Sequence, residues 1–591
     1  MKTLFLATAA LTAALTAVLT STPCFAQWTN DSSQNTLVTE SLCQTWETAG
    51  LSDGSTVIYY TYPERLEDGT FAMKHYLQLL DKDGYFVWDE PLFVSHAPNR
   101  TYTMVNKYLF IDANDNILIS IPDTRYDTAN NFDIFMNTTC YKISKTGEFL
   151  WGQNGVRIDN SEHDLIAQVN AVALENGNIV LAYLEQDNNP LSIKMTCLSD
   201  GGEFRWKKDL KINGVNDGNT PKIVNGGNNE FIVVYTYGSA SIAAQKFDLS
   251  GEEVWGHTII YNRGALPSAP AHTWLEVIPV ERGAFVSWCD DRDGNNFEDA
   301  YCNYVDRDGQ LLSNGTDGVK LGYSISMRQF TPVGAYDAVN KFVYYTWSEM
   351  SFNQTHARTV GQKLSLSGEL VWEPEAVEIT PFLDRRVAYQ SVQTGKDGGA
   401  AFFCLEETNS NKDYNGIAQY RSVNGDSVLW NTCFTSNSGA EDGKIYTKTN
   451  LSVLPLRNNQ WVAIWDDTRP EANANLTVHP WAQNISIDGT LGVVEDVATE
   501  KPVMATTATV NFRVSKNPVS DKAEFTVANL KGSNVDISIL NPLGKQVGKV
   551  FNGRLSSDNQ TFSWNVSVAK GIYFAVLRSD NKAETVKMIV K

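Results

Sequence analysis

Acidic residues and an arginine follow an apolar run at three places in the chain. Their shared pattern is Asp-x-Arg, at Asp123 and Arg125, Asp290 and Arg292, and Asp467 and Arg469. Carboxylate oxygens are the ligands that calcium prefers, and the stretch CDDRDGNNFED is the richest in them. The candidate calcium ligands are Asp290, Asp291, Asp293 and Asp299, although their spacing is not that of an EF-hand. The alternative is an Asp–Arg pair that fixes each hairpin turn, and repetition of the pattern favours this alternative.

The sequence lacks the common catalytic motifs. Its seven histidines form no HExxH, and there is no P-loop and no dinucleotide-binding glycine pattern in a suitable setting. No catalytic residue is therefore predicted. The paired carboxylates of a glycosidase come from distant strands, however, so the sequence leaves this class of enzyme open. Apart from calcium, the sequence predicts no cofactor.

Cysteines are scattered singly after residue 26, without a CxxC pair, which argues against a zinc or iron–sulfur site. Their number there is odd, so they cannot all pair within one chain. Cys289 and Cys302 flank one loop and are the candidate disulfide across a hairpin. The equal alternative is that they are free thiols buried in sheet cores.

A repeated turn must position these residues. Glycine is followed four residues later by tryptophan in five copies: Gly84 and Trp88, Gly147 and Trp151, Gly202 and Trp206, Gly251 and Trp255, and Gly368 and Trp372. Weaker copies place Gly309 before Ser313, Gly425 before Trp430 and Gly489 before Val493. The mean period is about 58 residues. Upstream of each copy stands an apolar run that predicts a buried strand, among them TVIYYTY, FIVVYTY and WVAIW.

Each unit is therefore a small antiparallel sheet that cannot bury both of its faces alone. Radial packing of such repeats predicts an all-β chain, with an eight-bladed β-propeller over residues 27–500. Seven blades are the alternative if one unit is split between the two ends. We expect the tryptophans to fill the gaps between neighbouring sheets, and the glycines to give the hairpins their backbone freedom.

The N-terminus predicts export. Lys2, the apolar stretch from Leu4 to Leu19 and the small Ala26 are typical of a signal peptide over residues 1–26. No later stretch is apolar for long enough to span a bilayer, so the sequence predicts no transmembrane segment.

The C-terminus differs in kind from the repeats. After a linker at residues 501–511, alternating strands over 512–591 predict a small immunoglobulin-like β-sandwich. Asn517-Pro518, ILNPLGKQV, GIYF at Gly571–Phe574 and a last strand ending in lysine resemble the C-terminal sorting domain of the type IX secretion system of Bacteroidota. The resemblance implies that residues 512–591 engage that machinery, that the protein crosses the outer membrane, and that this domain is removed. The rest is then linked to surface polysaccharide or released.

Charge divides the chain in the same way and bears on function. Residues 511–591 carry 12 Lys and Arg against 6 Asp and Glu, whereas residues 27–510 carry 35 against 62. An acidic surface repels nucleic acid and anionic membranes and attracts cationic proteins. We therefore expect a displayed, non-catalytic binding protein for an extracellular macromolecule, best a cationic secreted host protein such as a trypsin-like protease.

The alternative function is a secreted glycan-processing enzyme, either a glycoside hydrolase or a polysaccharide lyase, or a glycan-binding module. The enzyme hypothesis predicts a central pocket lined by at least two acidic residues with aromatic platforms beside it.

Overall fold

The computed structural model describes residues 28–591 with internal gaps. The gaps are 42, 66–68, 70, 96–107, 124–136, 160–164, 187–191, 213–217, 239–240, 263–274, 325, 373–375, 409–412, 437–445, 470–477, 494–510, 529–530, 542–544, 558 and 580–581. The predicted signal peptide at 1–26 and residues 501–510 of the predicted linker lie outside the described residues. The chain divides into two compact units, residues 1–495 and 496–591. None of the helical structure in the described ranges is long and apolar enough to cross a membrane.

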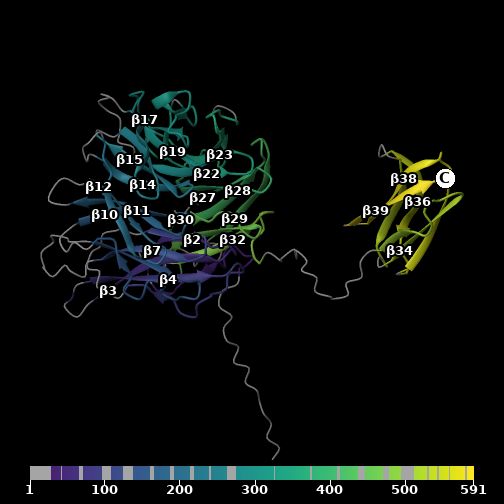
Figure 1. The fold of residues 1–591 in the computed structure, drawn as a ribbon. Coiled ribbons are helices and arrows are strands. Elements are labelled where there is room, and N and C mark those ends of the chain that lie inside the picture. Colours follow the sequence, from purple (N-terminus) through teal and green to yellow (C-terminus); the bar gives the residue numbers. More distant parts are fainter. Residues whose placement is uncertain are drawn as a thin grey trace, which may run out of the picture. The chain divides into compact units, whose positions relative to one another are not determined.

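The first unit consists of four-stranded antiparallel sheets, of which the described residues form eight (Figure 1). Numbered along the chain, sheets one to four are β2 (Gln44–Gly50), β3 (Thr56–Arg65), β4 (Phe71–Leu80) and β5 (Leu92–Phe93); β6 (Tyr108–Ile111), β7 (Ile117–Asp123), β8 (Asn137–Ile143) and β9 (Val156–Arg157); β10 (Leu165–Ala173), β11 (Ile179–Gln186), β12 (Ser192–Leu198) and β13 (Phe204–Asp209); and β14 (Gly218–Gly227), β15 (Glu230–Tyr237), β16 (Ser241–Phe247) and β17 (Glu253–Tyr261).

Sheets five to eight repeat this order of strands. They are β18 (Glu276–Val280), β19 (Gly283–Asp290), β20 (Asp299–Val305) and β21 (Val319–Lys320), with the 3-10 turn η1 (Gly315–Asp317); β22 (Arg328–Asp337), β23 (Phe342–Met350), β24 (Ala357–Ser365) and β25 (Val377–Glu378); β26 (Val387–Thr394), β27 (Ala400–Glu407), β28 (Tyr414–Arg421) and β29 (Val428–Thr435); and β30 (Lys448–Val453), β31 (Gln460–Asp467), β32 (His479–Ser486) and β1 (Thr36–Leu37).

The sheets close into a circle. The first strand of each sheet contacts the first strand of the next, from β2 through β6, β10, β14, β18, β22 and β26 to β30, and β30 contacts β2 again. Figure 1 shows the sheets arranged around a common centre. This is the propeller-type arrangement that the repeats predict, and we call it the ring of sheets.

Each second strand is buried on both faces, because its apolar side chains fill the spaces between its own sheet and the two neighbouring sheets. In β15, Phe231, Val233 and Tyr235 pack towards sheet three, while Ile232 and Val234 pack towards sheet five. The two sets alternate along the strand, as the two-residue period of a β-strand requires. The uninterrupted apolar runs of the sequence are therefore these second strands.

Indole groups tie most sheets to the hairpin of the next sheet. Six tryptophans donate a hydrogen bond from Nε1 to the carbonyl oxygen that lies two residues before the glycine of the following repeat. The pairs are Trp88 with Lys145, Trp151 with Asp200, Trp206 with Leu249, Trp255 with Arg307, Trp372 with Val423 and Trp430 with Ile487, at 2.9–3.2 Å.

Glycine is required where an indole meets the hairpin. Gly202 has φ +82°, and a Cβ atom there would lie 2.9 Å from the indole of Trp151. The repeat with Ser313 in the tryptophan position uses an aliphatic neighbour instead, because Leu312 lies against Gly368. The glycine and tryptophan of the repeat therefore make contacts between neighbouring sheets, not contacts within one sheet.

The N-terminal segment completes the eighth sheet. β1 pairs with β32, so the outer strand of this sheet comes from the beginning of the chain. Trp28 donates from Nε1 to the carbonyl of Lys82 at 2.8 Å and lies against Gly84, in the manner of the other tryptophans. It supplies the indole that the eighth repeat lacks at Val493. One unit is therefore split between the two ends, and the split yields a complete sheet.

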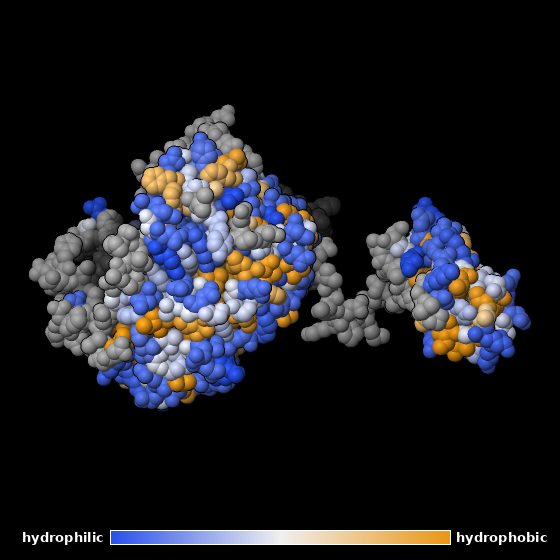
Figure 2. Space-filling view, turned by 90° about the horizontal axis from the view of Figure 1, so that it is seen from above, coloured by the Kyte–Doolittle hydropathy of each residue, from blue (hydrophilic) through white to orange (hydrophobic). Residues whose placement is uncertain are grey.

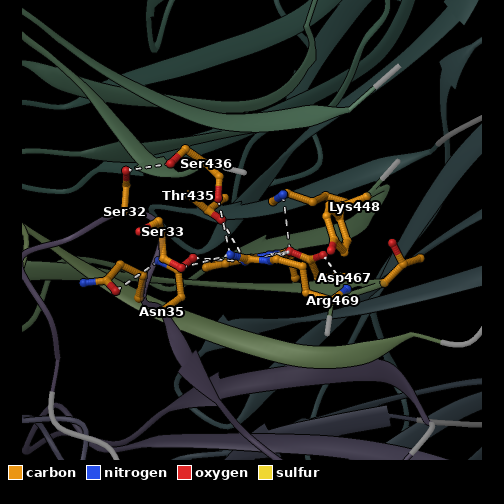
Figure 3. A network of polar contacts seen from close by, with 12 residues as sticks. Ser32, Ser33, Asn35, Thr435, Ser436, Lys448, Asp467 and Arg469 are labelled. Atoms are coloured by element: carbon orange, nitrogen blue, oxygen red, sulfur yellow. Dashed lines mark hydrogen bonds and ion pairs between the residues drawn. The ribbon is translucent and has the colours of Figure 1, made fainter. Parts of the chain in front are cut away.

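Polar contacts hold this junction in place (Figure 3). Arg469 pairs with Asp467 at 2.7 Å and donates to the side chain of Asn35 at 3.1 Å. Asn35 in turn donates to the carbonyl of Phe434 in sheet seven at 2.9 Å. The arginine and the asparagine thus join the N-terminal segment to sheets seven and eight.

The second unit is a pair of sheets around one core. β33 (Asn511–Val514), β34 (Lys522–Ala528) and β37 (Asn559–Asn565) form one sheet, and β36 (Gln546–Arg554), β35 (Asn534–Leu540), β38 (Gly571–Ser579) and β39 (Lys582–Val590) form the other. Phe525, Ile537, Leu577 and Met588 are fully buried between them.

Replacing Trp28 tests the closure of the ring of sheets. Trp28 is 3% exposed, so Trp28→Ala should lower the free energy of unfolding of the larger unit by about 3–5 kcal/mol. Trp28→Phe keeps most of the packing and loses the indole donor, and should cost about 1–2 kcal/mol. Urea unfolding followed by circular dichroism measures both, and an unchanged midpoint for Trp28→Ala would show that closure does not depend on this side chain.

Candidate functional site

The register of the sheets places one residue of each first strand at the same level of the central channel. In six sheets this residue pairs with a residue of the second strand. That partner stands three positions before an acidic residue near the end of the second strand. Sheets one and four follow the same register. The eight residues are Glu47, Tyr108, Asn170, Lys222, Glu276, Val333, Ser391 and Ser452. Seven of them are polar, and five of these lie on consecutive sheets, from sheet one to sheet five.

A β-bulge precedes this level in most of the first strands. The pairing shifts between Ala167 and Asn170 and between Asn219 and Lys222, and similar shifts occur in four other first strands. Thr220 (φ 49°) and Thr331 (φ 50°) have left-handed backbone conformations at such shifts, which β-branched residues rarely adopt. Bulges and strained residues of this kind redirect side chains, and they are common beside functional sites.

The five polar residues of sheets one to five line one cavity. Glu47, Tyr108, Asn170, Lys222 and Glu276 surround a volume of about 550 Å³ in the channel. Glu47 belongs to sheet one and Glu276 to sheet five, which are opposite each other in the cyclic order of the eight sheets. The channel thus brings two carboxyl groups, an amine and a phenol to one hollow.

Burial governs the protonation of these groups. Withdrawal from water raises the pKa of Glu47 to about 7, and the charge of Glu276 adds to this shift while Lys222 opposes it. The pKa of Glu276 is raised for the same reason, again against Lys222. Burial and the two carboxylates raise the pKa of Tyr108, so its phenol stays protonated. Near neutral pH the site therefore holds an acid that can give up a proton, a second carboxyl group and two hydrogen-bond donors.

The Asp-x-Arg residues lie elsewhere, at the ends of second strands. Arg292 binds both oxygens of Asp290, at 2.8 and 2.6 Å, and its guanidinium lies 3.7 Å from the centre of the Tyr301 ring. Arg469 binds Asp467 at 2.7 Å in sheet eight. Arg125 is outside the described residues. These contacts agree with a pair that fixes the hairpin.

Other sheets carry an ion pair at the same place without the sequence pattern. Glu185 pairs with Lys207 and Glu349 with Arg358, each at 2.7 Å. In these sheets the basic residue does not stand next to the acidic residue in the sequence, so the ion pair leaves no local sequence motif.

The candidate calcium ligands each have partners within the protein. Asp291 accepts hydrogen bonds from the backbone amides of Asn295 and Asn296 at 3.0 Å. Lys320 pairs with Asp299 at 2.7 Å and with Asp293 at 3.7 Å. In the part of the chain that the structure describes, no group of three or more acidic, histidine or cysteine side chains is arranged to hold a metal ion. The calcium hypothesis therefore stays a prediction.

The disulfide candidate is wrong, because Cys289 and Cys302 are free thiols. The register of β19 and β20 pairs Cys289 with Ala300 and Cys302 with Ser287, so the two cysteines are not opposite each other. Both are buried, and burial raises the pKa of each thiol. They belong to the apolar packing between sheets five and six.

Comparison with known proteins identifies the second unit. Residues 517–591 match the model of the secretion system C-terminal sorting domain. No curated protein matches the chain in sequence.

Similar solved structures are remote from this chain. They include the polysaccharide lyase Uly1 (10% identity over 68% of this chain and 94% of that one, TM-score 0.40). An α-L-arabinanase of Penicillium chrysogenum complexed with arabinobiose has 11% identity over 55% and 94%, with a TM-score of 0.29. An α-L-arabinofuranosidase of Fusarium graminearum with arabinobiose has 9% identity over 55% and 94%, with a TM-score of 0.27. The sorting-domain match is the informative one: the C-terminal unit is a type IX secretion sorting domain, which directs the protein across the outer membrane to the cell surface or the extracellular space.

Proposed function

We propose that the ring of sheets is a secreted glycan-processing enzyme, in the first instance a glycoside hydrolase, with its active site in the central channel. The observation that carries this proposal is the pair of carboxyl groups, Glu47 and Glu276, on opposite sides of one cavity with raised pKa values. Two carboxyl groups that flank the scissile bond are what glycosidases use, and the sequence-based enzyme hypothesis required them in this place.

The environment of each group suggests its role. Glu47, with a pKa of about 7, is suited to protonate the leaving oxygen of a glycosidic bond. Glu276, partly stabilised as the carboxylate by Lys222, is suited to act as the base or the nucleophile. Tyr108 and Asn170 are placed to orient sugar hydroxyls from the same wall of the cavity.

Charge favours hydrolysis of a neutral glycan over the lyase alternative. A polysaccharide lyase acts on acidic sugars, and a uronate would meet two carboxyl groups and a single lysine in this cavity. The unit around the cavity also has an excess of acidic residues, which repels polyanions. A neutral polysaccharide carries neither penalty.

The proposed architecture gives this activity a rigid support. We propose that the eight sheets are the blades of an eight-bladed propeller over residues 27–500, that residues 501–511 are a linker, and that residues 512–591 form an immunoglobulin-like sandwich. Removal of the sandwich after export would leave an acidic propeller, attached to the cell surface or released.

The acidity also supports a second candidate, which is binding of a cationic secreted protein. A trypsin-like protease at low salt is a direct probe, because attraction to an acidic surface weakens as salt rises. Retention of the protease on the immobilised protein at low salt and its release at high salt would support this candidate. Equal retention by an uncharged resin would remove it.

Substitution of the two carboxyl groups tests the proposed hydrolase. The protein is assayed for release of reducing ends from neutral xylan, arabinan, galactan and mixed-linkage β-glucan, with polygalacturonate as the acidic comparison. Glu47→Gln and Glu276→Gln should each lower the rate on the cleaved polymer by about 100-fold or more. Glu148→Gln, at an exposed hairpin of the opposite end of the sheets, is the matched control and should leave the rate unchanged. Full activity of both channel variants would contradict the assignment.

Stability against pH tests the environment of Glu47 without relying on activity. A carboxyl group whose pKa rises from 4.5 to about 7 on folding stabilises the protein below pH 4.5, and this stabilisation is lost as the pH rises through 7. Between pH 5 and pH 8 the stability of Glu47→Gln relative to the natural protein should therefore increase, by about 2–3 kcal/mol. Urea unfolding at both pH values measures the difference, and a constant difference would show that Glu47 has an ordinary pKa.

A further inference from the structure

Exposed aromatic side chains gather at one end of sheets five to seven. Phe352 is 60% exposed, Tyr323 59% and Tyr389 41%, and all three lie at the end where the second strands finish. Most other exposed large apolar residues of the larger unit lie singly on hairpins or outer strands. Figure 2 shows apolar and hydrophilic residues interspersed on one face. Single exposed apolar residues are ordinary, whereas a cluster marks a binding surface.

Contacts join pairs of aromatic side chains at this end and the loops that carry them. The rings of Phe297 and Phe352 meet edge to face, with centroids 5.8 Å apart. Phe382 lies 5.6 Å from the ring of His356, which stands in the same loop as Phe352. Lys320 lies 5.8 Å from the Tyr323 ring and pairs with Asp293 in the loop that carries Phe297. We call Phe297, Tyr323, Phe352 and Phe382 the aromatic platform; Tyr323 and Phe352 are exposed, Phe297 and Phe382 are half-buried, and Tyr389 is not part of it.

Arg328 connects the aromatic platform to the channel. Its guanidinium lies 5.1 Å from the centre of the Phe352 ring and 3.5 Å from Glu298. Arg328 is the first residue of β22, and Thr331 and Val333 of the same strand line a channel cavity with Glu276. Only three residues of one strand therefore separate the platform from the wall of the proposed active site.

Hydrogen bonds within the protein hold the loop that carries Phe297. Gln329 donates its backbone amide to the carbonyl of Glu298 at 2.7 Å, and its side chain accepts from the amide of Ala300 at 2.9 Å. Asp291 holds the turn before Phe297, as described above. Ordering a loop costs free energy on binding, so a surface that is already ordered binds more tightly.

We infer that the aromatic platform is a sugar-stacking subsite, which holds rings of a neutral polysaccharide outside the channel while another part of the chain reaches Glu47 and Glu276. Aromatic faces pack against the C–H faces of sugars, and the nearby Lys320, Arg328 and His356 offer hydrogen bonds to the hydroxyls. This inference rests on the proposed function. It narrows the proposed substrate to a polymer that is longer than the cavity.

Affinity electrophoresis separates the two claims. The full protein carrying Glu276→Gln, which stops turnover, is run in gels that contain each of the four neutral polysaccharides of the activity assay. In this background, Phe352→Ala should raise the dissociation constant obtained from the retardation by about 10-fold, since loss of one aromatic stack costs about 1 kcal/mol of binding free energy or slightly more. Phe352→Trp keeps the stack and should restore the binding. Phe204→Ala is the matched control, because Phe204 is 57% exposed on an outer strand of sheet three.

Each outcome decides one claim. Retardation that falls for Phe352→Ala, and is kept by Phe352→Trp and Phe204→Ala, supports the subsite. Retardation that is equal in all variants overturns the subsite and leaves the proposed hydrolase standing. Absence of retardation by all four polysaccharides, together with absence of cleavage, overturns the proposed function itself.

Discussion

The contact between an indole and the hairpin of the next sheet is the constraint on which the rest of this structure depends. A four-stranded sheet of this size cannot bury both faces, so each sheet is stable only between two neighbours. The tryptophan fixes that neighbour through one hydrogen bond to a constant backbone position, and the glycine opposite it leaves room for the indole. Because the N-terminal segment supplies the last of these contacts, the first residues after the predicted signal peptide close a structure built by the whole larger unit.

Closure of the ring of sheets also creates the candidate site. The first strands bring Glu47 and Glu276, more than 200 residues apart in the sequence, into one cavity. Placing two carboxyl groups in a hollow that shields them from water raises their pKa values, which costs stability at neutral pH. The bulges with left-handed residues add strain at the same level. A site that costs stability is tolerated because the packing between the sheets is extensive, and such costs are common where chemistry is done.

The sequence was most informative where structure repeats and least informative where function departs from the repeat. Periodicity predicted an all-β chain of sheets around a centre, and quoted motifs predicted the sorting domain. The sequence did not reveal Glu47, Lys222 and Glu276, because first strands are half-polar and most of them are interrupted by bulges. One feature of the sequence could have located these residues. Each channel residue stands 11–13 residues before the residue of the apolar second strand with which it pairs, as Glu276 does before Ser287. The disulfide prediction failed because flanking one loop does not make two cysteines opposite in register.

Export and the proposed chemistry belong to separate parts of the chain, since the sorting domain directs secretion and the channel residues all belong to the ring of sheets. The most direct test of the account is a crystal structure of the Glu276→Gln protein soaked with an oligosaccharide of the polymer that it binds. The account predicts sugar density beside Glu47 in the channel, with the chain running towards Phe352. Sugar density confined to the outer rim of the sheets, with the channel occupied by ordered water alone, would contradict it.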